Sequence, residues 1–149
     1  MVSFTDRVER LHALNGAIHR KFTLDRGRPV SGRTAAEAFA LTAVTPRDLA
    51  QIFCAAARGL HVPARYVSGY SPVCFEGDIR PAPHGWAEAY IEGLGWVAFD
   101  PCTGLSADEA HARVAVALDS AGAAPVAGSR LGEGDEELDV DLHVGGNGQ

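Results

Sequence analysis

The sequence has no long hydrophobic run, no excess of positive charge and few cysteines. No apolar stretch reaches the ~20 residues that a membrane-spanning helix needs, and the first residues lack the hydrophobic core of a signal peptide. The net charge of −6 counts against nucleic acid or an anionic membrane as the main partner, because both attract proteins through basic surfaces. We therefore expect no nucleic acid partner and no membrane partner.

Only three cysteines occur among the 149 residues. Cys54, Cys74 and Cys102 form no CxxC pair, and an odd, low count does not indicate a disulfide framework. Together with His61 and His84, Cys74 and Cys102 are of types that bind zinc, but they lack the spacing of zinc ligands. These patterns favour a cytoplasmic protein with reduced cysteines, no metal and no other cofactor.

The composition is that of one folded domain. Apolar residues make up 46% of the chain and charged residues 21%, which is ordinary for globular proteins. A length of 149 residues fits a single domain. We expect one domain over residues 1–149, with an ordered core at about 8–144 and a tail at 145–149.

Three helices are expected before residue 60. Apolar residues recur at spacings of three or four between residues 8 and 22, which is typical of an amphipathic helix. Serine or threonine followed three residues later by an acidic residue marks the start of the first two helices, at Ser3 with Asp6 and at Thr34 with Glu37. For the third helix, Thr45 suits the N-cap, Pro46 the first helical position and Asp48 the helix dipole, and Gly59 is expected to end it.

Strands are expected after the helices. Residues 62–70 are rich in β-branched and aromatic side chains, which strands favour. Residues 86–91 and 96–100 suit a hairpin, and further strands are expected at 114–118 and, from the alternation of apolar residues, at 137–144. Helices followed by strands indicate an α+β fold, with an antiparallel sheet packed against helices.

The expected hairpin brings together a histidine and an aspartate. A three-residue loop at 91–93, with Gly93 supplying a positive φ, would place His84 directly opposite Asp100 on one face of the sheet. A carboxylate bonded to one imidazole nitrogen fixes the tautomer and stabilises the imidazolium cation. A turn centred on Gly95 would break this register.

Several segments agree in residue type, order and spacing with one known family. They are residues 47–51 (RDLAQ), 63–70 (PARYVSGY), 84–101, which holds HGWAEAY and GWVAFDP, and 111–117 (HARVAVA). From about residue 8 to 144 the chain resembles the core domain of bacterial transglutaminase-like proteins, which are papain-related cysteine enzymes. Members of this kind usually carry an additional β-rich domain upstream.

The resemblance implies a mechanism of acyl transfer through a thioester, either amide hydrolysis or transfer to an amine. It implies a cysteine nucleophile at a helix N-terminus, with His84 as the base and Asp100 as the residue that orients it. At the position of the nucleophile this sequence has Pro46, which has neither a thiol nor a backbone N–H. We therefore expect a pseudoenzyme that keeps the His84–Asp100 pair in a cleft of the peptide-binding type, able to take a peptide or protein ligand. The oligomeric state is left open.

A relocated thiol is the alternative. Cys74 precedes His84 in a loop, and Cys102 lies two residues beyond Asp100, so either could in principle serve as the nucleophile of an active amide hydrolase or acyl transferase. Cys54 falls about two turns into the third helix and suits the core. Thr45 is more plausible as an N-cap than as a nucleophile.

Overall fold

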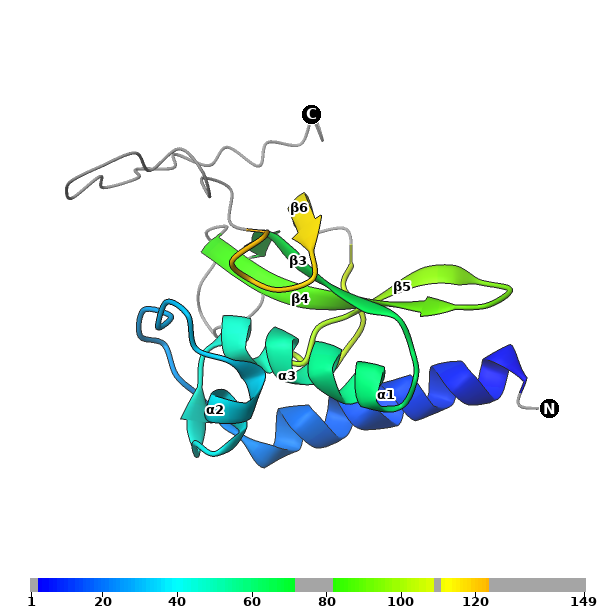
Figure 1. Ribbon diagram of the computed structural model, residues 1–149, viewed down its shortest axis with the longest axis horizontal. Coiled ribbons are helices and arrows are strands. Elements are labelled where there is room, and N and C mark those ends of the chain that lie inside the picture. The colour runs from blue at the N-terminus through cyan, green and yellow to red at the C-terminus, as the bar shows by residue number, and fades with distance from the viewer. Residues whose placement is uncertain (1–2, 72–81, 109–110, 124–149) are drawn as a thin grey trace.

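The computed structural model describes residues 3–71, 82–108 and 111–123, and shows a four-stranded antiparallel sheet with helices packed on one face (Figure 1). The elements are α1 (Phe4–Lys21), β1 (Thr23–Leu24), α2 (Ala35–Phe39), β2 (Ala43–Val44), α3 (Pro46–Gly59), β3 (Ala64–Ser71), β4 (Ala82–Ile91), β5 (Gly95–Phe99) and β6 (Ala112–Ala117). The sheet order is β5-β4-β3-β6, and β1 and β2 form a separate parallel pair. The predicted α+β class is confirmed.

The helix starts follow from local sequence. In α1, α2 and α3 the N-cap hydroxyl accepts the N–H of the acidic residue three positions on, and that acidic side chain accepts the N-cap N–H in return. At α3 the Thr45 hydroxyl accepts from the Asp48 N–H at 3.3 Å, and Asp48 Oδ2 accepts the Thr45 N–H at 3.1 Å. These exchanges satisfy backbone donors that the first helical turn leaves unpaired. All three predicted starts are confirmed.

The end of α3 differs in detail from the prediction. Gly59 is the last helical residue, as expected, but Leu60 is the C-cap and the residue in the left-handed conformation is His61, with φ of 61°. A non-glycine residue rarely adopts this conformation, because its Cβ crowds the following carbonyl. His61 is exposed, so glycine at position 61 would relieve this crowding without leaving a buried gap.

The core lies between α3, α1 and the sheet. Phe53 of α3 stacks on Phe99 of β5 with ring centroids 5.1 Å apart, and Leu11 of α1 is buried beside them. Cys54 is 2% exposed in the same core. Burial raises the pKa of its thiol to about 12, as expected for a structural cysteine and not for a reactive one.

The β4–β5 hairpin forms, but its register is shifted by two residues from the prediction. Tyr90 pairs with Trp96, and Ala87 pairs with Phe99, so the loop is 92–94 and not 91–93. Gly93 has the expected positive φ of 91°, and Gly95 has one of 93°. Side chains alternate faces with a period of two. A shift of two therefore keeps residues 84 and 100 on the same face, although they are not directly opposite.

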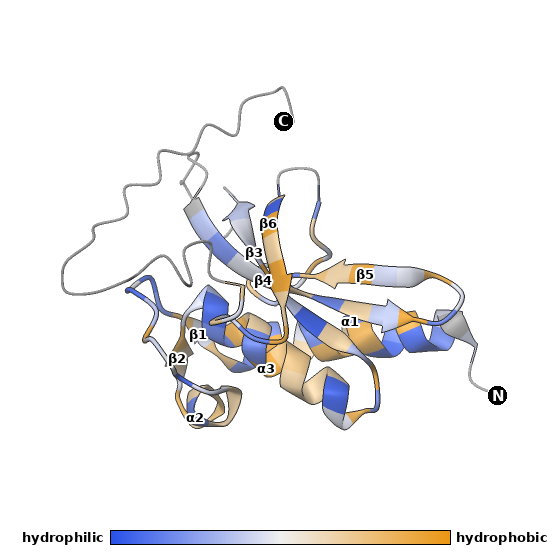
Figure 2. Ribbon diagram, turned by 45° about the horizontal axis from the view of Figure 1, so that its top comes forward, coloured by the Kyte–Doolittle hydropathy of each residue, from blue (hydrophilic) through white to orange (hydrophobic). Residues whose placement is uncertain are grey.

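β6 is the last strand of the sheet within the described residues, where it pairs with β3 alone. Figure 2 shows it as largely hydrophobic. Val114 and Val116 are 50% and 41% exposed. The alternate residues Ala115 and Ala117 are partly buried and pack against the core.

Some predictions fall outside the part of the chain that is described. The strand expected at 137–144, the tail at 145–149 and Cys74 lie there. Within the described ranges, the strand expected at 114–118 is present as β6. None of the helices in those ranges has both the length and the apolar character needed to cross a bilayer.

Candidate functional site

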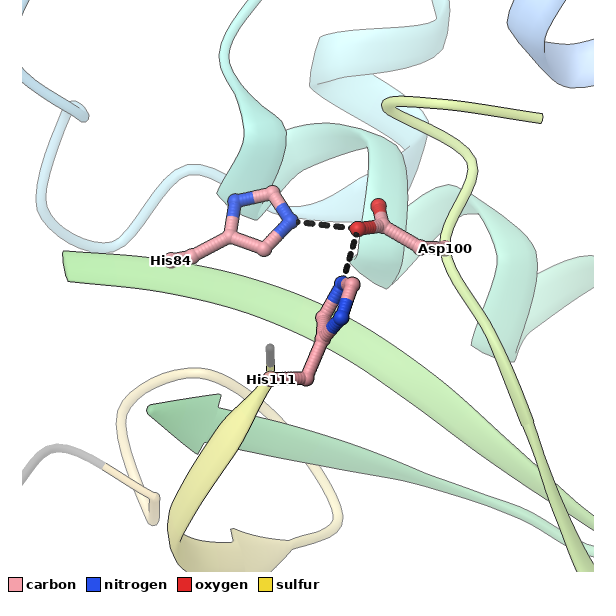
Figure 3. A group of neighbouring side chains, drawn as sticks. All are labelled: His84, Asp100 and His111. Carbon is pink, nitrogen blue, oxygen red and sulfur yellow. Dashed lines mark hydrogen bonds and ion pairs between the residues drawn. The ribbon is translucent and has the colours of Figure 1, made fainter. Parts of the chain in front are cut away.

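Asp100 is the centre of a buried polar cluster (Figure 3). It follows β5, and its backbone N–H donates to the Leu105 carbonyl at 2.8 Å. Its Oδ2 lies 2.7 Å from His84 Nε2 and 2.8 Å from His111 Nε2. Its Oδ1 accepts the Cys102 N–H at 3.0 Å. The carboxyl group, which is 0% exposed, is thus held by three hydrogen bonds.

His84 lies on β4, where it pairs with Gly69 of β3. The imidazole stacks on the Trp86 ring at 5.9 Å with an interplanar angle of 28°. The next residue, Gly85, leaves room for the Tyr66 hydroxyl, which a Cβ at position 85 would overlap. The sheet therefore brings together His84 and Asp100, the two candidate residues that the hairpin suggested, and leaves His84 Nδ1 pointing away from Asp100 (Figure 3).

His111 is a third member of the cluster, and the sequence analysis gave it no role. It directly precedes β6, and its side chain is 3% exposed. Its Nδ1 lies 3.0 Å from Asp108 Oδ1. It reaches the cluster across β3 at Gly69, where a Cβ would overlap the Ala112 carbonyl. A histidine 27 positions after His84 carries no local signal of this contact.

The contacts set the charges of the cluster. Burial alone would raise the pKa of the Asp100 carboxyl, but the hydrogen bonds and positive charges of His111 and His84 outweigh it and lower the pKa. Burial alone would lower the pKa of His111, but its bonds to Asp100 and Asp108 outweigh it and raise the pKa. The arrangement thus favours an aspartate anion beside a protonated imidazole.

These shifts predict a stability maximum in mildly acidic solution. The contribution of Asp100 is complete above its ordinary pKa of 3.8 and is lost as the pH falls through its lowered pKa. The contribution of His111 is complete below its ordinary pKa of 6.5 and is lost as the pH rises through its raised pKa. Urea unfolding at a series of pH values, with a chelator present, should show both losses.

The His111→Gln variant is the control for this pH dependence. It keeps Asp100, Asp108 and His84 but removes one of the two imidazoles that lower the Asp100 pKa. The loss at low pH should therefore persist in reduced form through His84, while the loss above pH 6.5 becomes smaller. An unchanged alkaline loss in this variant would show that another group is responsible.

Pro46 and His84 line the same hollow, which has a volume of about 290 Å³. Pro46 is the first residue of α3, which lies beneath the sheet. The wall of the hollow also includes Gly69, Gly85 and Arg47. The first turn of α3, with its partial positive charge, therefore lies at the same hollow as the imidazole of His84.

The cysteines are placed differently from one another. Cys54 is buried in the core. The sulfur of Cys102 is in a disulfide, which the count and spacing of the cysteines did not indicate, because spacing along the chain does not report proximity in space. Cys74 lies outside the described residues.

A possible metal-binding group is also present. Among the described residues, this is the one group of its kind, and its members are His84, Asp100 and His111. His61, which was considered as a zinc ligand, lines a separate hollow with Leu60.

Known proteins similar to this chain are found both by sequence and by structure. The sequence model of the transglutaminase-like superfamily matches residues 2–101. An uncharacterized protein of Mycobacterium leprae is 29% identical over 100 residues, which are 66% of this chain and 36% of that protein. A "putative cysteine protease" from Cytophaga hutchinsonii superposes with a TM-score of 0.67 at 29% identity, covering 78% of this chain and 38% of its own.

The chain thus spans little more than a third of the length of either relative. The family match nevertheless covers most of the chain, including α1, α3, β3 and the β4–β5 hairpin. The chain belongs to the transglutaminase-like superfamily.

Proposed function

We propose that this chain is a catalytically inactive transglutaminase-like domain that binds a peptide in the hollow between α3 and β4. The observation that carries the proposal is Pro46, which opens α3 and faces the same hollow as His84. By the family resemblance, this is where the nucleophilic cysteine is expected. A proline there supplies no thiolate for attack and no backbone N–H to stabilise an oxyanion.

The proline also suits the fold. Proline at the first helical position loses no intrahelical hydrogen bond, and its fixed φ matches the helix. The neighbouring cap is fully formed, because Asp48 Oδ2 accepts hydrogen bonds from the Thr45 N–H, the Thr45 hydroxyl and Arg33. These contacts stabilise the helix start without any catalytic group, which supports the proposal.

The walls of the hollow indicate the kind of peptide. Arg47 lines it, and no carboxylate does among the described residues. Arginine forms charge-assisted hydrogen bonds with carboxylates. We therefore expect a peptide with an acidic side chain or an acidic C-terminus.

Two measurements test the proposal. The full chain should show no hydrolysis of ester or amide substrates that iodoacetamide can abolish. An acidic peptide, but not a basic peptide of the same length, should shift the amide resonances of Gly69 and Gly85, and Arg47→Gln should reduce that shift. Thiol-dependent turnover would contradict inactivity, and equal responses to both peptides would contradict the proposed ligand.

The second candidate is an active hydrolase or acyl transferase that uses Cys74 or Cys102. This candidate is favoured by the hydrogen bond that the Cys102 N–H donates to Asp100 Oδ1 at 3.0 Å, which places Cys102 beside the cluster. The disulfide of Cys102 counts against it, because a disulfide sulfur is not a free thiol. Iodoacetamide labelling with mass mapping, before and after reduction, distinguishes the two candidates. A single fast-reacting cysteine that slows in His84→Ala would favour the hydrolase, whereas uniformly slow labelling favours the inactive domain. A cytoplasmic location stays a prediction.

A further inference from the structure

Three potential metal ligands converge in the buried cluster. The Nε2 atoms of His84 and His111 and Oδ2 of Asp100 lie within 4.8 Å of one another. In Figure 3 both rings turn Nε2 toward the same carboxylate oxygen, at 2.7 and 2.8 Å. We propose that His84, Asp100 and His111 bind a divalent transition-metal ion of the zinc type.

The donor set fits such an ion. Zinc binds imidazole nitrogen and carboxylate oxygen at about 2.0–2.2 Å. Two imidazole nitrogens and one carboxylate oxygen fill three of its four usual positions and leave the fourth open. Tetrahedral donors at these lengths lie roughly 3.3 Å apart. The N–O contacts of 2.7 and 2.8 Å would thus open by about 0.6 Å as the ion takes the place of the ring protons. The two imidazole nitrogens, which lie within 4.8 Å of each other, would close by up to about 1.5 Å.

The groups that hydrogen-bond to the three ligands also bear on metal binding. A metal-bound imidazole carries its proton on the other ring nitrogen, which usually donates to a carboxylate or carbonyl. His111 Nδ1 lies 3.0 Å from Asp108 Oδ1 and 3.1 Å from the Asp108 backbone N. The carboxylate can accept from a protonated Nδ1, whereas the backbone N–H would donate to an unprotonated one. The Cys102 N–H on Asp100 Oδ1 likewise leaves Oδ2 for the ion.

The three ligands come from separate parts of the fold that are held rigidly. His84 lies within β4, Asp100 is fixed by its bridge to Leu105, and His111 directly precedes β6. The Trp86 ring stacks on His84 and meets His111 edge-on at 5.0 Å. Ligands whose orientation is set by packing bind a metal without a large rearrangement. Metal binding here does not depend on whether the domain is inactive.

The experiment is a metal titration of the untagged full chain, stripped of metal and kept at neutral pH. Calorimetry should show one Zn²⁺ bound per chain, and Co²⁺ should give the visible absorption of a four- or five-coordinate ion. Mg²⁺ and Ca²⁺, which prefer all-oxygen sites, should not bind. His111→Gln should weaken Zn²⁺ binding at least 100-fold.

The matched control is His61→Gly. It also removes one imidazole, but from an exposed position with a φ of 61°, where glycine fits without strain, so the affinity for Zn²⁺ should not change. If His111→Gln fails to fold, Asp108→Ala decides the matter. This variant keeps all three ligands and removes the carboxylate beside His111 Nδ1. The Asp108 side chain is 63% exposed, so the variant should fold, and it should weaken Zn²⁺ binding about 10- to 100-fold.

The results that would overturn the proposal are equally definite. They are no binding of Zn²⁺ or Co²⁺ by the folded wild-type chain, binding that survives in folded His111→Gln, or, if that variant does not fold, unchanged affinity in Asp108→Ala. None of these results bears on substrate turnover, so a failure here is distinct from a failure of the proposed function.

Discussion

Replacing Asp100 with alanine is expected to lower the free energy of unfolding by about 3–5 kcal/mol. The change removes the acceptor of His84 Nε2, His111 Nε2 and the Cys102 N–H together. All three donors stay in a site where the histidine side chains are 2% and 3% exposed. A buried donor left without a partner loses its solvation without compensation.

Asp108→Ala is the matched control for this loss. It removes a carboxylate from the same cluster, but one whose side chain is 63% exposed, so the expected loss is about 0–1 kcal/mol. Urea unfolding followed by circular dichroism, with a chelator present, measures both variants. Equal losses in the two variants would mean that the buried hydrogen bonds of Asp100 contribute little to stability.

Replacing Pro46 with cysteine is expected to create the fastest-reacting thiol in the chain. The new side chain would stand at the first turn of α3, in the hollow that His84 also lines. A helix N-terminus and a nearby imidazole lower the pKa of a thiol from ~8.5 to as little as ~3.5–7.5. At neutral pH this increases the thiolate fraction, so iodoacetamide should label position 46 at least about tenfold faster than an unperturbed thiol.

The dependence on His84 separates activation from simple exposure. Adding His84→Ala to the Pro46→Cys variant should remove most of the rate gain, whereas adding His61→Gly should not. The Asp48 carboxylate, which already accepts hydrogen bonds from the N-cap Thr45, opposes some of the activation because it adds negative charge at the same helix end. The helix itself should lose about 0.4–1 kcal/mol of stability with the proline. A rate that does not change in His84→Ala would show that imidazole and thiol do not interact.

Features decided within a few residues could be predicted from the sequence. The capping exchange at Thr45 and Asp48 spans one helical turn, and the positive φ of Gly93 is intrinsic to a residue without Cβ. The pairing of His84 with Asp100 was also within reach, because the hairpin between them is short. The predicted register of the hairpin was wrong by two residues. His84 and Asp100 are still in contact, because a shift of two residues leaves both side chains on the same face of the sheet.

Features decided by distant segments could not be predicted in this way. His111 reaches Asp100 only because β6 pairs with β3 and β3 pairs with β4. A bulge between Ser68 and Gly69 adjusts that pairing. The residues near His111 indicate neither the strand with which β6 pairs nor the bulge. The disulfide of Cys102 could not be predicted either, because it too depends on which segments meet in space.

The place of His111 directly before β6 has a consequence for how the sheet opens. Within the described residues β6 pairs with β3 alone and exposes Val114 and Val116, so only the small side chains of Ala115 and Ala117 pack on the core. The residue before the strand, His111, binds Asp100 through its imidazole. Protonation of that single carboxylate should then release the strand locally while the helices stay folded. Backbone amides of residues 112–117 would exchange with deuterium faster in acid than those of α3, after allowance for the intrinsic rates.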